Sequence, residues 1–174
     1  DLPTLLRRQR QMCIRDRNQA KLRIQFQCCE PMSWIAALDP GRSKCGLVLA
    51  SLDQRCVIEG HVLPADAVLN TLERWQRSTP PERLIVGNGT SSAHWTAQLS
   101  NVLPVTLVDE RGTTLTARTR YWQLWPPRGW RRLVPLGLQL PPGELDALAA
   151  LVMLEKTLGF PLDWPEPPSI KTGP

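Results

Sequence analysis

Apolar residues fall into a regular pattern from Trp34 onward. The run 34–39 is apolar and ends at Asp39, where Pro40 and Gly41 favour a turn, so it predicts a buried strand. Apolar runs at 45–51, 55–62, 84–87 and 105–109 predict four more strands. The short connection at Asp53 and Gln54 predicts that the second and third strands form an antiparallel hairpin.

Helical spacing appears between and after these strands. Val68, Leu72 and Trp75 recur at helical intervals, so we expect a helix over 65–77 that ends at the two prolines that follow. Ser91 or Ser92 is placed to cap a short helix that runs to Leu99. Further helices are expected over 112–124 and 145–154, and the second is apolar on nearly all sides.

The order of these elements predicts an α/β fold. Three leading strands indicate an antiparallel meander, and two later strands that alternate with helices indicate parallel crossovers. We therefore expect a mixed five-stranded sheet flanked by helices, in a domain spanning residues 34–160. Residues 1–33 are expected to be a basic, disordered or non-native arm, because Met12–Arg17 resembles translated sequencing-adapter sequence. Residues 161–174 are expected to be an extended or disordered proline-rich tail.

Composition narrows the class of protein. A chain of 174 residues with 42% hydrophobic residues fits one domain with a single core. No apolar run reaches the ~20 residues that span a bilayer, and no apolar stretch follows the basic N-terminus. Five scattered cysteines without a C-x-x-C pair disfavour a zinc site or a disulfide scaffold. We expect a soluble cytoplasmic protein with reduced thiols.

The net charge of +5 is carried by residues 1–25, and the other residues balance to zero. The distribution of charge is more informative, because the stretch from Arg111 to Arg132 holds six arginines and no acid, with four aromatic residues among them. Arginines bind phosphates and aromatic rings stack on unpaired bases. The alternative is a solvated face whose tryptophans anchor a loop. The candidate nucleic-acid-binding residues are Arg42, Lys44, Arg111, Arg118, Arg120, Arg128, Arg131 and Arg132.

Three carboxylates are placed where predicted elements begin or end. Asp39 ends the first strand, Glu110 follows the last strand, and Asp146 lies in the first turn of the apolar helix. The carboxyl ends of neighbouring strands open on one edge of such a sheet. Carboxylates brought together repel unless a cation joins them, and oxygen ligands suit Mg²⁺ or Mn²⁺. Each acid also has an ordinary structural role open to it, in a turn or at a helix N-terminus.

Four segments in this order resemble the YqgF/RuvX family, over roughly residues 34–158. They are Ala37–Gly46 (ALDPGRSKCG), Ile85–Thr90 (IVGNGT), Val108–Arg118 (VDERGTTLTAR) and Leu145–Ala150 (LDALAA). The stretches RTRYW at 118–122 and PPRGWRR at 126–132 are most similar to a cyanobacterial branch of that family. The chain departs from the common bacterial pattern at Asn88 and in its tryptophan-rich insertion at 121–132.

The resemblance implies an RNase H-like fold and a metal-dependent nuclease, with Asp39, Glu110 and Asp146 matching the three acids of the family motifs. The family is associated with maturation of the 5′ end of pre-16S ribosomal RNA in ribosome biogenesis and with Holliday junction resolution. The expected partner is therefore precursor rRNA or branched DNA. Symmetric resolution of a four-way junction would require two active sites and hence a homodimer.

Two other functions remain open from the sequence. The first is a non-catalytic nucleic-acid-binding module on the same fold, which would gain nothing from clustered acids near phosphate. The second is an actin- or sugar-kinase-like ATPase, since a similar Asp-x-Gly pattern opens phosphate loops there. Such enzymes close two domains around ATP, and this chain is too short for both.

Overall fold

The computed structural model describes residues 33–41, 43–89, 91–135, 138–142 and 144–166. Arg42 and all but the last residue of the predicted basic arm lie outside the described residues, and so do residues 167–174. The described residues form one compact unit. No helix in the part of the chain that the structure describes is long and apolar enough to cross a membrane.

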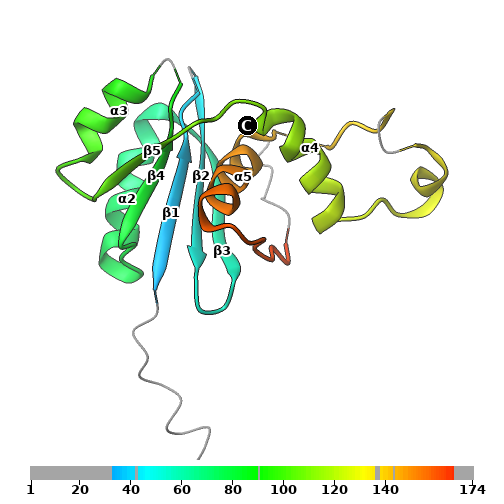
Figure 1. Cartoon of the computed structure of the whole chain (residues 1–174), viewed down its shortest axis with the longest axis horizontal. Coiled ribbons are helices and arrows are strands. Elements are labelled where there is room, and N and C mark those ends of the chain that lie inside the picture. Colours follow the sequence, from blue (N-terminus) through cyan, green and yellow to red (C-terminus); the bar gives the residue numbers. More distant parts are fainter. Residues whose placement is uncertain (1–32, 42, 90, 136–137, 143, 167–174) are drawn as a thin grey trace, which may run out of the picture. The chain divides into compact units, whose positions relative to one another are not determined.

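A five-stranded sheet forms the centre of this unit (Figure 1), in the order β3-β2-β1-β4-β5. Strands β1, β2 and β3 pair antiparallel, whereas β4 pairs parallel to β1 and β5 pairs parallel to β4. This order and these directions confirm the predicted mixed sheet and are those of the RNase H-like fold. The strands are β1 (Trp34–Asp39), β2 (Lys44–Ser51), β3 (Cys56–Pro64), β4 (Arg83–Gly87) and β5 (Val105–Val108).

Helices cover both faces of the sheet, as the alternation of elements predicted. Helices α2 and α3 pack on one face, α5 packs on the other, and α4 lies against the outer side of α5. A short 3-10 helix, η1 (Gly129–Leu133), lies in the otherwise largely irregular segment described between α4 and α5. The helices are α2 (Ala65–Ser78), α3 (Ser92–Leu99), α4 (Thr113–Leu124) and α5 (Asp146–Leu158).

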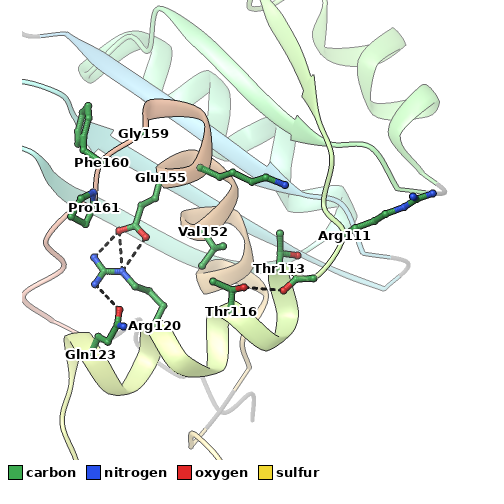
Figure 2. A pocket seen from close by; sticks show the side chains of 12 residues that line it. Arg111, Thr113, Thr116, Arg120, Gln123, Val152, Glu155, Gly159, Phe160 and Pro161 are labelled. Carbon is green, nitrogen blue, oxygen red and sulfur yellow. Dashed lines mark hydrogen bonds and ion pairs between the residues drawn. The ribbon is translucent and has the colours of Figure 1, made fainter.

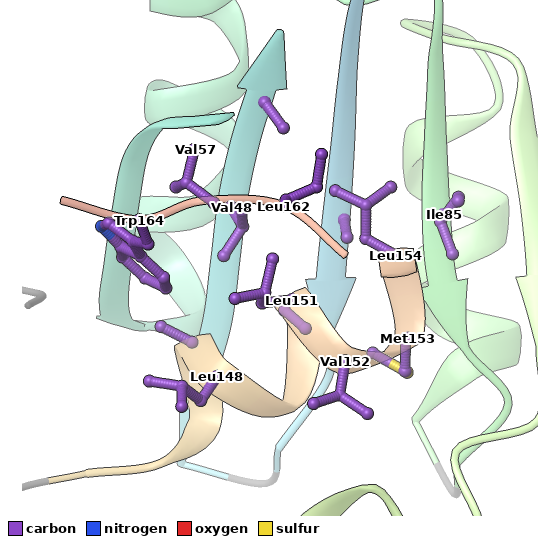
Figure 3. Close-up of a cluster of buried hydrophobic side chains, with 14 of the residues drawn as sticks. Val48, Val57, Ile85, Leu148, Leu151, Val152, Met153, Leu154, Leu162 and Trp164 are labelled. Atoms are coloured by element: carbon purple, nitrogen blue, oxygen red, sulfur yellow. The ribbon is translucent and has the colours of Figure 1, made fainter. Parts of the chain in front are cut away.

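Two hydrophobic layers follow from the alternation of side chains along β1. Ala36 and Leu38 face α2 and α3, in a layer that includes Trp75 and Trp95. Ile35 and Ala37 face α5, whose central residues are buried almost without interruption (Figure 3). Since Asp39 has the same parity as Ile35 and Ala37, the last residue of β1 belongs to the face that α5 covers.

The C-terminal segment departs from the expected tail. Leu162 and Trp164 are buried in the layer beneath α5, and Asp163 forms an isolated parallel bridge with Cys56 at the edge strand β3. The backbone N–H of Val57 donates to the Asp163 carbonyl at 2.8 Å. The packed domain therefore continues past residue 160. The composition predicted an unpacked tail because prolines dominate this segment, and the two apolar residues that pack into the core, Leu162 and Trp164, gave too weak a signal among them.

The start of α3 is a second departure. Ser91 occupies the N-cap position but makes no capping hydrogen bond through its side chain, and Ser92 donates to Asn88 Oδ1 at 3.4 Å instead. The helix begins at the predicted residue without the predicted cap. The Ser92 backbone N–H is bonded to the Gly89 carbonyl at 3.0 Å, so the turn before the helix satisfies one of its free donors.

Candidate active site and nucleic-acid interface

Asp39 and Asp146 are brought together by a close approach of two backbones. Asp39 pairs in register with Gly46 on β2, and the first turn of α5 crosses the sheet at that glycine. A Cβ added at Gly46 would collide with the Asp146 carbonyl and lie 2.6 Å from the Ala147 nitrogen. Only glycine leaves room for this crossing, so the residue at 46 positions the acid that begins α5.

Glu110 is held at the neighbouring strand ends by two more glycines. A Cβ at Gly87 would lie 2.7 Å from Glu110 Oε2, 3.0 Å from Met153 Sδ and 3.3 Å from Pro40 Cδ. A Cβ at Gly89 would lie 2.6 Å from Glu110 Oε1. The carboxylate therefore lies in a notch beside the residue that follows Asp39. This notch gives the glycines of the 87–90 segment a role that the sequence analysis did not assign.

The charges of these acids act on one another. Burial, then the negative charge of Glu110 and then that of Asp146, raises the pKa of Asp39 from its ordinary value of 3.8 to about 7. Burial and the charge of Glu144 raise the pKa of Asp146, whereas its own backbone N–H and Lys44 act to lower it. Both shifts disfavour the ionised form. Placing the partly buried Asp39 beside Glu110 and Asp146 thus costs the folded protein electrostatic energy.

A fourth acid, Glu144, adjoins the site and was not predicted from the sequence. It forms an ion pair with Lys44, and both side chains are about half exposed. The expected role of Lys44 in steering phosphate stays a prediction, and in this structure its ammonium group pairs with Glu144. The ion pair could not be predicted from the sequence, because Lys44 and Glu144 lie 100 positions apart and meet only where the start of β2 lies beside the start of α5.

The donor set suits a hard divalent cation, since it consists of carboxylate oxygens without a cysteine or histidine among them. Among the described residues, however, no group of three or more His, Cys, Asp or Glu side chains is already arranged to hold a metal ion. Assignment of Asp39, Glu110 and Asp146 as metal ligands therefore stays a prediction. The nearby thiol of Cys45 faces the opposite layer as a core residue, and burial raises its pKa.

Arginines of the predicted basic patch differ in their exposure to solvent. Arg120 is mostly buried and donates to Glu155 through Nε and Nη2, at 2.7–3.0 Å, and to the Leu162 carbonyl at 2.8 Å. Arg118 lies on α4 and is partly buried. Four arginines are exposed to solvent along the segment that begins after β5 and ends in η1: Arg111, Arg128, Arg131 and Arg132.

The aromatic residues of the same stretch differ in the same way. Trp122 is buried, and Trp125 packs edge-on against Tyr121 and Trp164 at centroid distances of 5.0 and 5.6 Å. Trp130, at the start of η1, is 73% exposed. The interpretation that some tryptophans anchor the segment holds for two of them, and Trp130 alone of the three is displayed beside exposed arginines.

No protein-family model matches this chain, and no curated protein matches it significantly. Among solved structures it is similar to T. thermophilus RuvC in complex with a Holliday junction substrate. The identity is 18% and the TM-score 0.42, over 73% of this chain and 96% of that chain. The fold assignment therefore rests on the strand topology of this chain, and the site on its own residues. Membership of the YqgF/RuvX family stays a prediction.

Proposed function

We propose that this protein is a metal-dependent nuclease that hydrolyses phosphodiester bonds, with Asp39, Glu110 and Asp146 as its catalytic residues. One observation carries the proposal: backbone packing at glycines directs three acids from distant parts of the chain to one edge of the sheet, at a cost to the folded state. A cost of this kind is typical of functional sites, where perturbed pKa values cluster. A structural role for the trio would not require it.

The residues of this edge offer oxygen ligands from three directions. Asp39 contributes from the end of β1, Asp146 from the start of α5, and the Glu110 carboxylate from its notch beside Gly87 and Gly89. Asp39, Glu110 and Asp146 would hold one or two Mg²⁺ or Mn²⁺ ions, which would supply Lewis-acid activation of a water and stabilisation of the leaving oxygen. The apolar side chain of Met153 lies on the same side of Gly87 as the Glu110 carboxylate.

The segment from α4 to η1 supports nucleic acid as the substrate class. Arg128, Arg131 and Arg132 are exposed around Trp130, in a segment where no residue is acidic. Gln139 holds this segment in shape by donating to the Arg131 and Val134 carbonyls. A fixed cationic surface with one displayed ring suits phosphates flanking an unpaired base.

The motif resemblance directs the choice of substrate to precursor 16S rRNA at its 5′ end, with a Holliday junction as the second candidate. The direct experiment compares cleavage of both labelled nucleic acids by the full chain in Mg²⁺, in Mn²⁺ and in chelator. We expect cleavage with metal and none in chelator, and we expect Asp39→Asn to abolish it. Cleavage that persists in chelator or in Asp39→Asn would contradict the mechanism.

A non-catalytic binding module is the alternative function, and the absence of a ready-made cluster of metal ligands among the described residues is the observation that favours it. Such a module would bind the same nucleic acids equally well with metal and in chelator. Its affinity would rise in Asp39→Asn, because the variant removes a negative charge from the surface that faces phosphate.

A further inference from the structure

An open groove lies between α4 and α5, on the side of α5 that faces away from the sheet (Figure 2). Its volume is about 510 Å³, within the range of about 300–1,000 Å³ typical of small-molecule sites. The groove starts at Arg111, which directly follows the proposed catalytic Glu110, and continues towards Phe160 and Pro161 after α5.

One end of the groove is cationic. Arg111 and Lys156 both line it, and Lys156 Nζ lies 3.5 Å from the Asp109 carbonyl, which places the ammonium group beside the turn that carries Arg111. Helix α4 begins at this end of the groove, and its first turn contains no acidic residue. Among the described residues neither Arg111 nor Lys156 forms an ion pair, and the Asp109 carboxylate at this turn accepts from the Arg111 backbone N–H at 3.0 Å. Two cations at one end of the groove favour a ligand with a phosphate group.

The floor of the groove is apolar. Val152 on α5 and the residues Phe160 and Pro161 line it. The Phe160 ring is covered on one face by the Arg55 guanidinium, 4.9 Å from the ring centroid. A free phosphate would make no use of such a floor, whereas a planar base would bury it.

The remaining end is polar but balanced in charge. Arg120 and Glu155 neutralise each other through their bidentate ion pair, and Arg120 Nη1 donates to Gln123 Oε1 at 3.3 Å. The Gln123 amide nitrogen keeps two donors for the edge of a base. The groove therefore presents cations, apolar side chains and hydrogen-bonding groups.

We propose that this groove binds a nucleoside phosphate, with the phosphate at the end that Arg111 and Lys156 line and the base over Val152. The inference deepens the proposed function and rests on it only in the position of the groove next to Glu110. The same chemistry occurs in a nucleotide of a bound strand beside the cleavage site and in a free nucleotide.

The test measures binding of AMP, adenosine and inorganic phosphate to the full chain in chelator, by titration calorimetry. We expect AMP to bind about tenfold or more tightly than adenosine or phosphate, since one charge-assisted contact is worth that much. The double variant Arg111→Ala/Lys156→Ala should bind AMP no better than adenosine. Arg77→Ala, which removes an exposed arginine from α2 on the opposite face, is the matched control and should leave AMP binding unchanged.

A second variant separates the groove from simple attraction of anions. Thr116 is exposed on the α4 wall, and Thr116→Trp fills the groove without changing its charge. It should abolish AMP binding while thermal unfolding stays cooperative, and Gln123→Trp provides the same block from the other end if Thr116→Trp does not fold. Unchanged AMP binding in a folded blocking variant, or AMP binding no tighter than phosphate, would overturn the proposal.

Two further measurements distinguish a strand-bound nucleotide from a free one and separate the test of the groove from the test of the nuclease activity. A short single-stranded oligonucleotide that competes with AMP and binds more tightly assigns the groove to a strand, whereas tighter binding of AMP assigns it to a free nucleotide. Asp39→Asn should bind AMP like the wild-type chain. Failure of metal-dependent cleavage with AMP binding intact refutes the nuclease alone, and loss of AMP binding with cleavage intact refutes the groove alone.

Discussion

Replacement of Asp39 by asparagine should stabilise the metal-free protein. The folded state raises the pKa of Asp39 from 3.8 to about 7 through burial and the charges of Glu110 and Asp146. Between these two pH values the folded protein holds a proton that the unfolded chain has released. Stability of the wild-type chain therefore falls as pH rises across this window and levels off above pH 7, where both states are ionised.

The magnitude follows from the same shift. Each pKa unit corresponds to about 1.4 kcal/mol, so ionised Asp39 costs the folded state on the order of 4 kcal/mol above pH 7. Asparagine carries no charge and removes this cost. Part of the gain in stability is lost again, because the buried asparagine amide needs hydrogen-bond partners in the same place. For a domain of this size we expect a rise in Tm on the order of 10 °C at pH 8.

The assay is denaturant unfolding in chelator at a series of pH values. The stability difference between Asp39→Asn and wild type should be small near pH 4 and largest above pH 7. Asp66→Asn, in the exposed first turn of α2 on the other face of the sheet, is the matched control and should show no such growth with pH. A variant no more stable than wild type at pH 8 would refute the claim that this site is held together against repulsion.

A divalent metal ion should reverse the order of stability of the wild-type chain and Asp39→Asn. A saturating divalent cation stabilises whichever protein binds it by RT ln(1 + [L]/Kd), which is about 2.7 kcal/mol at a hundredfold excess over Kd. Mn²⁺ should therefore raise the Tm of the wild-type chain and leave Asp39→Asn unchanged. Equal shifts in both proteins would place the ion elsewhere.

Three further outcomes test single contacts. Gly46→Ala should displace the start of α5 at Asp146 and lower the free energy of unfolding in urea by about 1–3 kcal/mol. It should also lower the affinity for Mn²⁺ in calorimetry, and an unchanged affinity would refute the positioning role of the glycine. Arg120→Met should cost about 3 kcal/mol because it strands the mostly buried Glu155 carboxylate, and a near-neutral urea midpoint would contradict this. Trp130→Ala should weaken single-stranded RNA binding about tenfold in anisotropy titrations through lost stacking, with no change in Tm.

Sequence patterns were sufficient for the sheet and most helix boundaries. The apolar runs that predicted β1 and β4 are strands with buried central residues. The near-continuous apolar helix from residue 145 is α5, which packs between the sheet and α4. These elements were predictable because an element that is buried on two sides appears in the sequence as a nearly continuous run of apolar residues. The strand order also followed, since short connections restrict antiparallel pairing and helical crossovers impose parallel pairing.

The site was predictable only in part. Placement of Asp39 and Glu110 at strand ends follows from local pattern, but their notch depends on glycines whose lack of a side chain gives no hydrophobic signal. The pairing of Arg120 with Glu155 was not predicted, because the sequence of a basic stretch does not reveal which of its arginines face solvent and which face a neighbouring helix. Lys156, at the cationic end of the groove, stood alone in the sequence and gained significance only from the packing of α5 against the turn at Asp109.

The bridge between Asp163 and Cys56 has a consequence for synthesis of the chain. Strand β3 is the outer strand on its side of the sheet, and its unpaired backbone groups at Cys56 and Val57 meet their partners only when residues about a hundred positions later arrive. Until then the nascent domain carries an open template for strand addition by another chain. Tags and truncations should therefore be placed beyond Glu166, because an earlier stop would remove Trp164 and leave that template open to self-association.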